Sequence, residues 1–125
     1  MSDFRQKALD YHQYPTPGKI SVELTKPAET SADLALAYSP GVAEPVREIA
    51  NNPDDVYKYT GKGNTVAVIT NGTAILGLGN LGPMASKPVM EGKSLLFKRF
   101  ANIDSIDIEV KHRTSEEFIN TVEAI

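Results

Sequence analysis

One uninterrupted run of β-branched and apolar residues, Thr65–Thr70, most constrains the fold of this 125-residue chain. Valine, isoleucine and threonine favour extended backbone, and a run that is apolar on both sides indicates a central strand. Residues 105–110 predict a second strand, and between the two runs a helix is expected to open at Ser86 and Pro88 and to end near Ala101. This strand–helix–strand order predicts a mixed α/β domain.

The N-terminal third follows a different pattern. Residues 3–14 carry apolar side chains at helical spacing, which predicts a short helix. The proline-rich residues 15–33 predict an extended arm, in which the alternating residues 20–24 form one edge strand. We therefore expect a helix and arm over residues 1–33, followed by a domain over residues 34–125.

Three shorter patterns complete the chain. A helix is expected from near Glu44 to the Asn-Asn-Pro stop at residues 51–53, and residues 74–76 predict a short return strand after an Asn-Gly turn. Thr114 and Glu117 form a capping-box pattern that begins a final helix. No glycine, asparagine or proline stops that helix, so we expect the chain to be cut short of a longer protein.

Charge and composition exclude several classes of function. Thirteen basic and sixteen acidic residues give a formal net charge of −3, so no cationic surface for nucleic acid or anionic lipid is expected. The chain has no cysteine, and His12 and His112, both expected at the surface, are too few for a three-histidine zinc site. Without an apolar leader or a run of about 20 apolar residues, we expect a cytoplasmic protein rather than a membrane protein.

Lys93 is the first candidate for chemistry. The expected buried stripe of its helix consists of Val89, Leu96 and Phe100. At about 100° per residue, Lys93 lies within roughly 40° of Val89, whereas Lys87 and Lys98 lie on the opposite, solvent face. A lysine on a core-facing stripe either extends its ammonium group to water past the helix edge, or is desolvated, which lowers the pKa and allows it to act as a base near neutral pH.

Tyr38 is the second candidate, in the turn Tyr38-Ser39-Pro40-Gly41 that leads into the helix near Glu44. The free N–H groups and the dipole at a helix N-terminus favour an anion, such as a substrate carboxylate. A tyrosine has an ordinary pKa of about 10, so it donates a proton readily only where a nearby cation or metal stabilises the phenolate. The alternative is a half-buried aromatic ring that anchors the loop.

A glycine-rich segment, Gly77–Gly82, matches the pattern GxGxxG, and Asp104 follows it at about the spacing of a dinucleotide-binding fingerprint. However, Pro83 follows directly and the next helix is expected only near Ser86. We therefore favour the alternative, in which a glycine turn allows close packing in or beside a site.

Asp104, Asp107 and Glu109 form the one acidic cluster that resembles a set of metal ligands. Asp107 and Glu109 alternate with Ile106 and Ile108 along the predicted strand, so the pattern indicates a solvated strand face. A hard cation would also need further oxygen ligands, which the sequence does not identify.

Several motifs recur in a definite order along nearly the whole chain: Pro17-Gly18-Lys19-Ile20, Thr25-Lys26-Pro27, residues 34–43, residues 71–82 and residues 87–93. Together they resemble the N-terminal domain of a bacterial malic enzyme, of the NADP-dependent type often fused to a phosphotransacetylase-like domain. The resemblance implies a small three-layer α/β domain with a short, mainly parallel sheet flanked by helices, similar to amino-acid dehydrogenase N-terminal domains. It also implies a homodimer or larger homo-oligomer, with the N-terminal arm as a contact surface.

The same resemblance implies a reaction. Malate is oxidised by NAD or NADP, the oxaloacetate loses CO2, and the enol is protonated to pyruvate, with Mg or Mn as a Lewis acid. Lys93 is then the general base for the malate hydroxyl, and Tyr38 is the proton donor to the enol carbon. Further substrate-binding or site-shaping positions are Ser39, Gly41, Gly77 and Gly79. The family's metal ligands and nucleotide-binding domain lie beyond residue 125, so this chain is expected to hold no metal or cofactor and to be inactive alone.

Some alternatives stay open. Large animal-type malic enzymes carry a substrate-binding arginine where this chain has Ala74, so the backbone after Tyr38 is one substitute for holding the carboxylate. The chain could instead be a non-catalytic dimerisation or regulatory module, in which Lys93 only extends to water. A third hypothesis is a self-standing dinucleotide-binding domain built around Gly77–Gly82.

Overall fold

The computed structural model describes residues 2–111 and 113–125, which form two compact units. The first unit comprises Met1–Ile20 and Thr65–Ile125, and the second comprises Ser21–Asn64. Among the described residues, no helix has the length and hydropathy needed to cross a bilayer. The functional division at residue 33, expected from the sequence, stays a prediction.

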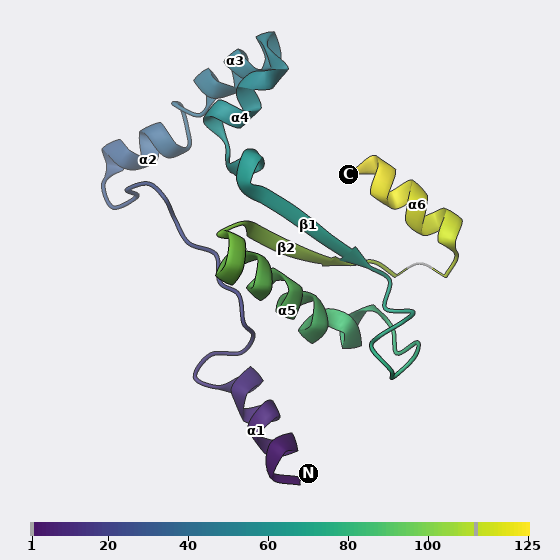
Figure 1. Cartoon of the computed structure of the whole chain (residues 1–125). Helices are drawn as coiled ribbons and strands as arrows, with labels where there is room; N and C mark the ends of the chain where they lie inside the picture. The colour runs from purple at the N-terminus through teal and green to yellow at the C-terminus, as the bar shows by residue number, and fades with distance from the viewer. Residues whose placement is uncertain (1, 112) are drawn as a thin grey trace. The chain divides into compact units, whose positions relative to one another are not determined.

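A parallel strand–helix–strand motif forms the centre of the first unit (Figure 1). β1 (Thr65–Thr70) pairs with β2 (Asp104–Glu109) in parallel, and α5 (Pro83–Ala101) connects the two strands and packs against both. The predicted mixed α/β class and the parallel sheet are confirmed. β1 has the predicted bounds, whereas β2 starts and ends one residue earlier than predicted. The described sheet has two strands, so β1 is not the central strand that its composition indicated.

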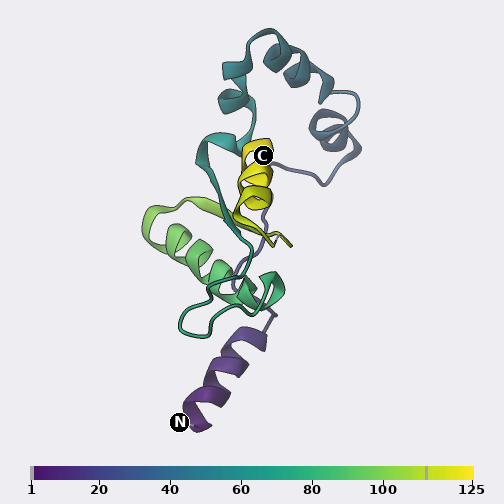
Figure 2. The same ribbon diagram turned by 90° about the vertical axis from the view of Figure 1, so that its right-hand side faces the viewer.

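The inner face of the sheet, which α5 covers in both views (Figure 1, Figure 2), is mostly polar. It is formed by Val66, Val68, Thr70, Ser105, Asp107 and Glu109. From the helix, Ser86, Met90 and Ser94 are buried, at a spacing of four residues. The Ser94 hydroxyl donates a hydrogen bond to the buried Ser105 hydroxyl at 3.0 Å, so neither polar group is left unpaired by burial.

The prediction that Val89, Leu96 and Phe100 form the buried face of α5 is therefore wrong. Leu96 and Phe100 are 53% and 77% exposed, and Val89 is half-buried. Apolar periodicity pointed to the wrong face because it treats serine as a surface residue. A serine with a paired hydroxyl is small enough to let a helix approach a sheet closely, and its hydrogen bond offsets the cost of desolvation.

The loop at residues 71–82, between β1 and α5, is closed at its neck by two glycines. The N–H of Gly82 donates to the carbonyl of Gly72 at 3.1 Å, and Gly72 has a φ of 70°. Inside the loop Ile75 is buried, and its N–H donates to the carbonyl of Gly79 at 2.9 Å. The prediction of a short return strand at residues 74–76 is wrong, because the backbone hydrogen bonds of Ile75 are made to other residues of the same loop.

Two further helices complete the first unit. α1 (Ser2–Gln13) matches the predicted N-terminal helix, and α6 (Ser115–Ala124) begins at the predicted capping box. The Thr114 hydroxyl accepts from the N–H of Glu117 at 3.2 Å, and the Glu117 carboxylate accepts from the N–H of Thr114 at 3.2 Å. Two amide groups at the start of α6 are therefore paired by side chains.

Replacing the cap residue, Thr114→Ala, is expected to loosen α6. An N-cap threonine is worth about 1 kcal/mol, which corresponds to roughly fivefold faster amide exchange over the first turn of the helix. Hydrogen exchange followed by NMR measures this directly. Ser115→Ala, which removes a neighbouring hydroxyl outside the cap, is the control and should leave exchange unchanged; equal acceleration in both variants would contradict the capping argument.

The second unit consists of short helices. They are α2 (Ser31–Ala37), α3 (Ala43–Asn51), the 3₁₀ turns η1 (Pro53–Asp55) and η2 (Gly61–Asn64), and α4 (Val56–Tyr59). α3 confirms the helix predicted near Glu44, whereas α2 and α4 were not predicted. The prediction of an edge strand at residues 20–24 is wrong, because the described backbone there pairs with no other strand.

Candidate functional site

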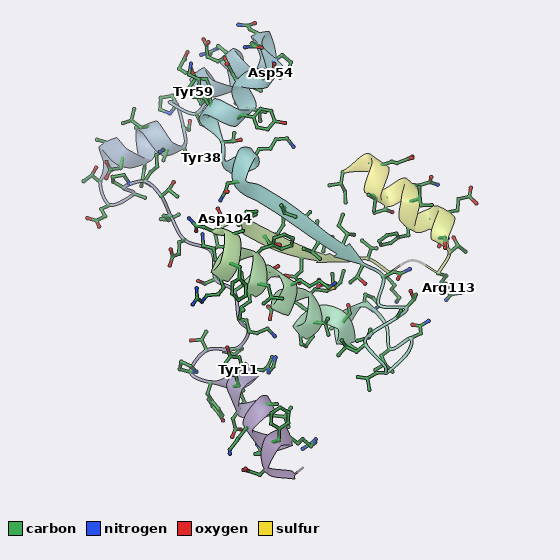
Figure 3. The ribbon with its side chains drawn as sticks, viewed as in Figure 1. Tyr11, Tyr38, Asp54, Tyr59, Asp104 and Arg113 are labelled. Carbon is green, nitrogen blue, oxygen red and sulfur yellow. The ribbon has the colours of Figure 1, made fainter. Side chains whose placement is uncertain are left out.

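Tyr38 directly follows the last residue of α2 in the second unit, and it is labelled in Figure 3. Its N–H donates to the carbonyl of Leu34 at 2.9 Å, and its carbonyl accepts from the N–H of Val42 at 2.7 Å. The backbone is therefore held on both sides, while the residue is 74% exposed. The predicted turn before a helix N-terminus is confirmed by α3, which begins at Ala43, but the alternative of a half-buried anchoring ring is wrong.

Gly41 sets the shape of the turn that carries Tyr38. Its N–H donates to the carbonyl of Ala35 at 2.8 Å. A Cβ at this position would lie 2.6 Å from that carbonyl oxygen and 2.9 Å from Cα of Leu36, closer than side-chain atoms approach backbone. The turn can therefore fold back on α2 only with glycine here, which leaves Ser39 exposed beside Tyr38.

Lys93 lies on α5 in the first unit and is exposed, so its predicted place on a buried stripe is wrong. The next residue along the helix, Ser94, is bonded to Ser105 of β2 and is the most deeply buried of the described side chains. Because that contact fixes the rotation of α5 about its axis, it also fixes the direction in which Lys93 leaves the helix. Tyr38 and Lys93 belong to different units, and each is held by contacts within its own unit.

The end of the N-terminal segment is attached to α5 near Lys93. The ammonium group of Lys19 donates to the carbonyl of Pro88 at 2.8 Å. Beside it, Gly18 has a φ of 86°, and a Cβ there would lie 3.2 Å from the Glu91 carboxylate. The motif Pro17-Gly18-Lys19-Ile20 thus contacts the helix one turn before the candidate base.

Two lysines of α5 pair with carboxylates of β2. Lys87 Nζ lies 2.5 Å from Asp107 Oδ2 and 3.7 Å from Glu109 Oε2, and Lys98 Nζ lies 2.9 Å from Asp104 Oδ1. Both lysines were predicted on the solvent face of the helix, and their side chains are indeed 52% and 54% exposed, although each reaches a carboxylate of β2. The side chains of Asp107 and Glu109 are only 10% and 13% exposed, so the predicted solvated strand face is wrong.

These acidic residues do not fit a divalent cation, because lysine ammonium groups occupy the space beside the carboxylates. Residues 2–111 and 113–125 contain no group of three or more histidine, aspartate or glutamate side chains arranged to hold a metal. His12 is exposed on α1, as predicted, and its Nδ1 bonds to the carbonyl of Ala8 at 2.7 Å. His112 lies outside the described residues.

The glycine-rich loop does not fit the pyrophosphate of a dinucleotide. In the fingerprint, the glycines form a tight turn directly between strand and helix. Here β1 ends at Thr70, and the whole loop, with buried Ile75, precedes the helix. α5 begins at Pro83, so the predicted helix start near Ser86 is wrong.

Gly77 and Gly79 lie at the exposed part of this loop. A Cβ on either would meet no atom within 4 Å, although Gly79 has a φ of 83°. Leu76 and Leu78 alternate with these glycines and are 76% and 66% exposed. The loop therefore presents open backbone and apolar side chains, which suits a site-shaping role better than close internal packing.

Comparison with known proteins gives a consistent result. The family model "Malic enzyme, N-terminal domain" matches residues 17–122. The chain is 71% identical to an NADP-dependent malic enzyme of Halomonas elongata, over 97% of this chain and 29% of that protein. It is 53% identical to an NAD-dependent malic enzyme of Rhizobium meliloti, over 98% of this chain and 16% of that protein.

The solved structures agree. The crystal structure of a malic enzyme from Pyrococcus horikoshii matches with a TM-score of 0.93 and 52% identity, over 98% of this chain and 29% of that one. The chain thus spans less than a third of the length of each of these relatives. The family match includes the turn with Tyr38 and the helix with Lys93. By sequence and by structure, the chain belongs to the malic enzyme N-terminal domain family.

Proposed function

We propose that this chain supplies the two proton-transfer residues of a malic enzyme, which converts malate to pyruvate and CO2 and reduces NADP or NAD. The family match over residues 17–122 carries the proposal, because it includes Tyr38 and Lys93 in one continuous stretch. The described residues fit neither a divalent metal nor a dinucleotide, so we assign those groups to other parts of the enzyme. The chain by itself is then inactive.

Lys93 is proposed as the general base. Its amine takes the proton of the malate hydroxyl as that carbon is oxidised to the ketone. Only a neutral amine can accept a proton, and covering an amine from water disfavours its charged form. The exposed position of Lys93 on α5 therefore leaves its side chain available to be covered by the rest of the enzyme together with substrate.

Tyr38 is proposed as the general acid. After CO2 leaves, the carbon of the enol in its deprotonated, enolate form needs a proton: the phenol O–H bond breaks, a C–H bond forms, and the products are the ketone of pyruvate and a tyrosinate. The exposed phenol on a rigid turn suits this role. The N–H groups at the start of α3 do not replace the arginine absent at Ala74, because those of Val42, Ala43 and Glu44 already donate to backbone carbonyls and residue 45 is a proline.

The variant Tyr38→Phe tests this assignment in a malic enzyme that carries this chain as its N-terminal domain. We expect deuterium exchange at the methyl carbon of pyruvate to fall by about 100-fold or more, because general acids typically contribute that much. Reduction of oxaloacetate to malate does not use the enol proton, so it should stay close to the wild-type rate.

Tyr57→Phe is the matched control, because Tyr57 is another exposed tyrosine of the same unit. It should keep both activities. Wild-type exchange in Tyr38→Phe would remove Tyr38 from the mechanism, whereas equal loss of exchange and oxaloacetate reduction would indicate a general structural defect.

The oligomeric state and the location of the protein stay predictions. A homo-oligomer is supported by α1, on which Phe4 and Tyr11 are 76% and 61% exposed, because large apolar side chains gathered on one helix often mark a contact surface. A cytoplasmic location is expected from the sequence.

A further inference from the structure

A charged cluster between α5 and β2 takes no part in the proposed proton transfers. Asp107 and Glu109 lie two residues apart on β2, so both point to the face that α5 covers, and their side chains are 10% and 13% exposed. Lys87 reaches them from α5 and is half exposed. Two carboxyl groups with little access to water are thus gathered beside one half-exposed lysine.

The ammonium group of Lys87 lies closer to Asp107 than to Glu109. Lys87 Nζ lies 2.5 Å from Asp107 Oδ2 but 3.7 Å from Glu109 Oε2, which is beyond hydrogen-bond length. The second carboxyl oxygen of Glu109, Oε1, is buried and has no hydrogen-bond partner among the described residues. A buried carboxylate without a partner is costly, and a proton removes that cost by removing the charge.

Among the described residues, Asp107 and Glu109 form ion pairs with Lys87 alone. The β1 residues opposite Asp107 and Glu109 are Val68 and Thr70, which carry no charge. On α5, the carboxylate of Glu91 is a further charge that acts on Lys87, and Lys98 pairs with Asp104 at the other end of the helix. One ammonium group therefore faces two carboxyl groups.

We propose that Asp107 and Glu109 hold one proton between them, carried by Glu109, and that the Lys87 ammonium group, paired with the remaining carboxylate, fastens α5 to β2. The Glu109 carboxyl donates its O–H to the Asp107 carboxylate, which also accepts from the Lys87 ammonium group. The cluster is then neutral in sum, and the helix that carries Lys93 is attached to the sheet in a pH-dependent way.

The electrostatic environment agrees with this placement of the proton. Burial, the hydrogen bond with Asp107 and the negative charge of Asp107 all raise the pKa of Glu109. Burial works against ionisation of Asp107, but hydrogen bonds from Glu109 and Lys87 outweigh it and lower its pKa. The hydrogen bond to Asp107 raises the pKa of Lys87.

These directions define how stability depends on pH. The raised pKa of Glu109 contributes stability that is complete below the ordinary value of 4.5 and is lost as the pH rises through the folded-state pKa. The lowered pKa of Asp107 contributes stability that is complete above 3.8 and is lost as the pH falls through its folded-state pKa. Both contributions are complete between pH 3.8 and 4.5, and the Glu109 contribution weakens toward neutral pH.

A carboxyl-carbon NMR titration of the wild-type 125-residue chain tests the proposal. We expect Glu109 to titrate with a midpoint above 4.5 and Asp107 with a midpoint below 3.8. Lys87→Met should raise the midpoints of both. Lys98→Met is the matched control, because it removes the other lysine–carboxylate pair between the same helix and strand, and it should leave both midpoints unchanged.

Unfolding in urea provides a second test. Glu109→Gln keeps a neutral group that can donate to Asp107, so its stability relative to wild type should rise between pH 4.5 and pH 7 as wild-type Glu109 loses its proton. A midpoint for Glu109 at or below 4.5, or a pH-independent stability difference, would overturn the proposal. The wild-type titration decides even where a variant fails to fold, and neither readout depends on the proposed function.

Discussion

Replacing Lys93 with methionine is expected to lower kcat/KM for malate by about 10²- to 10⁴-fold in a malic enzyme that carries this chain. The estimate is the usual contribution of a positioned general base. Methionine keeps much of the length and helix propensity of lysine but cannot accept a proton. Reduction of oxaloacetate should be lost in parallel, since the reverse reaction returns the same proton to the same oxygen.

The pattern across partial reactions separates catalysis from folding. Deuterium exchange at the pyruvate methyl carbon depends on Tyr38 and should persist in Lys93→Met. The matched control is Lys98→Met, on the same helix, which removes an exposed ion pair worth about 1 kcal/mol or less. If Lys93→Met kept wild-type malate oxidation, or if Lys98→Met lost it equally, Lys93 would not be the base.

Gly72→Ala is expected to destabilise the first unit by roughly 2–5 kcal/mol, from the usual costs of a left-handed non-glycine residue and of overpacking. A Cβ there would lie 2.1 Å from the carbonyl oxygen of Gly82 and 2.6 Å from the nitrogen of Pro83. Both contacts are with backbone, so no side-chain rotation relieves them. The start of α5 would have to move away from β1.

Urea unfolding followed by circular dichroism measures this loss. Gly77→Ala is the control in the same loop, because a Cβ at Gly77 meets no atom within 4 Å and its φ is not in the left-handed region. We expect a change within about 0.5 kcal/mol, as for an ordinary surface substitution. Equal losses in the two variants would show that the loop neck at Gly72 and Gly82 has no special role.

Local signals in the sequence predicted much of the fold. β1 has the bounds that its β-branched run indicated, and the Thr114–Glu117 pair caps α6 as its spacing predicted. The same kind of signal was missed at α2, where Thr30 and Asp33 form a capping box with a shorter acid in place of glutamate. Elements built from neighbouring residues can be read from sequence because their bonds lie within a few positions.

The buried face of a strand or helix was harder to predict than its position in the sequence. Alternation along β2 correctly separates Ile106 and Ile108 from Asp107 and Glu109, but it does not say which of the two faces α5 covers. Hydrophobicity favoured the isoleucine face, whereas α5 packs on the polar one. That arrangement is stable because Lys87 pairs with the carboxyl groups and the inward serines pair with each other.

For the candidate site, the sequence by itself determined which residues are proposed to act and which elements carry them, because the motifs around Tyr38 and Lys93 are local. The tertiary structure decided how those residues are presented. Lys93 is exposed because the bond between Ser94 and Ser105 fixes the rotation of α5, and that bond joins residues of two different elements. A helical pattern defines positions around an axis, but only contacts with the sheet decide which side of that axis faces water.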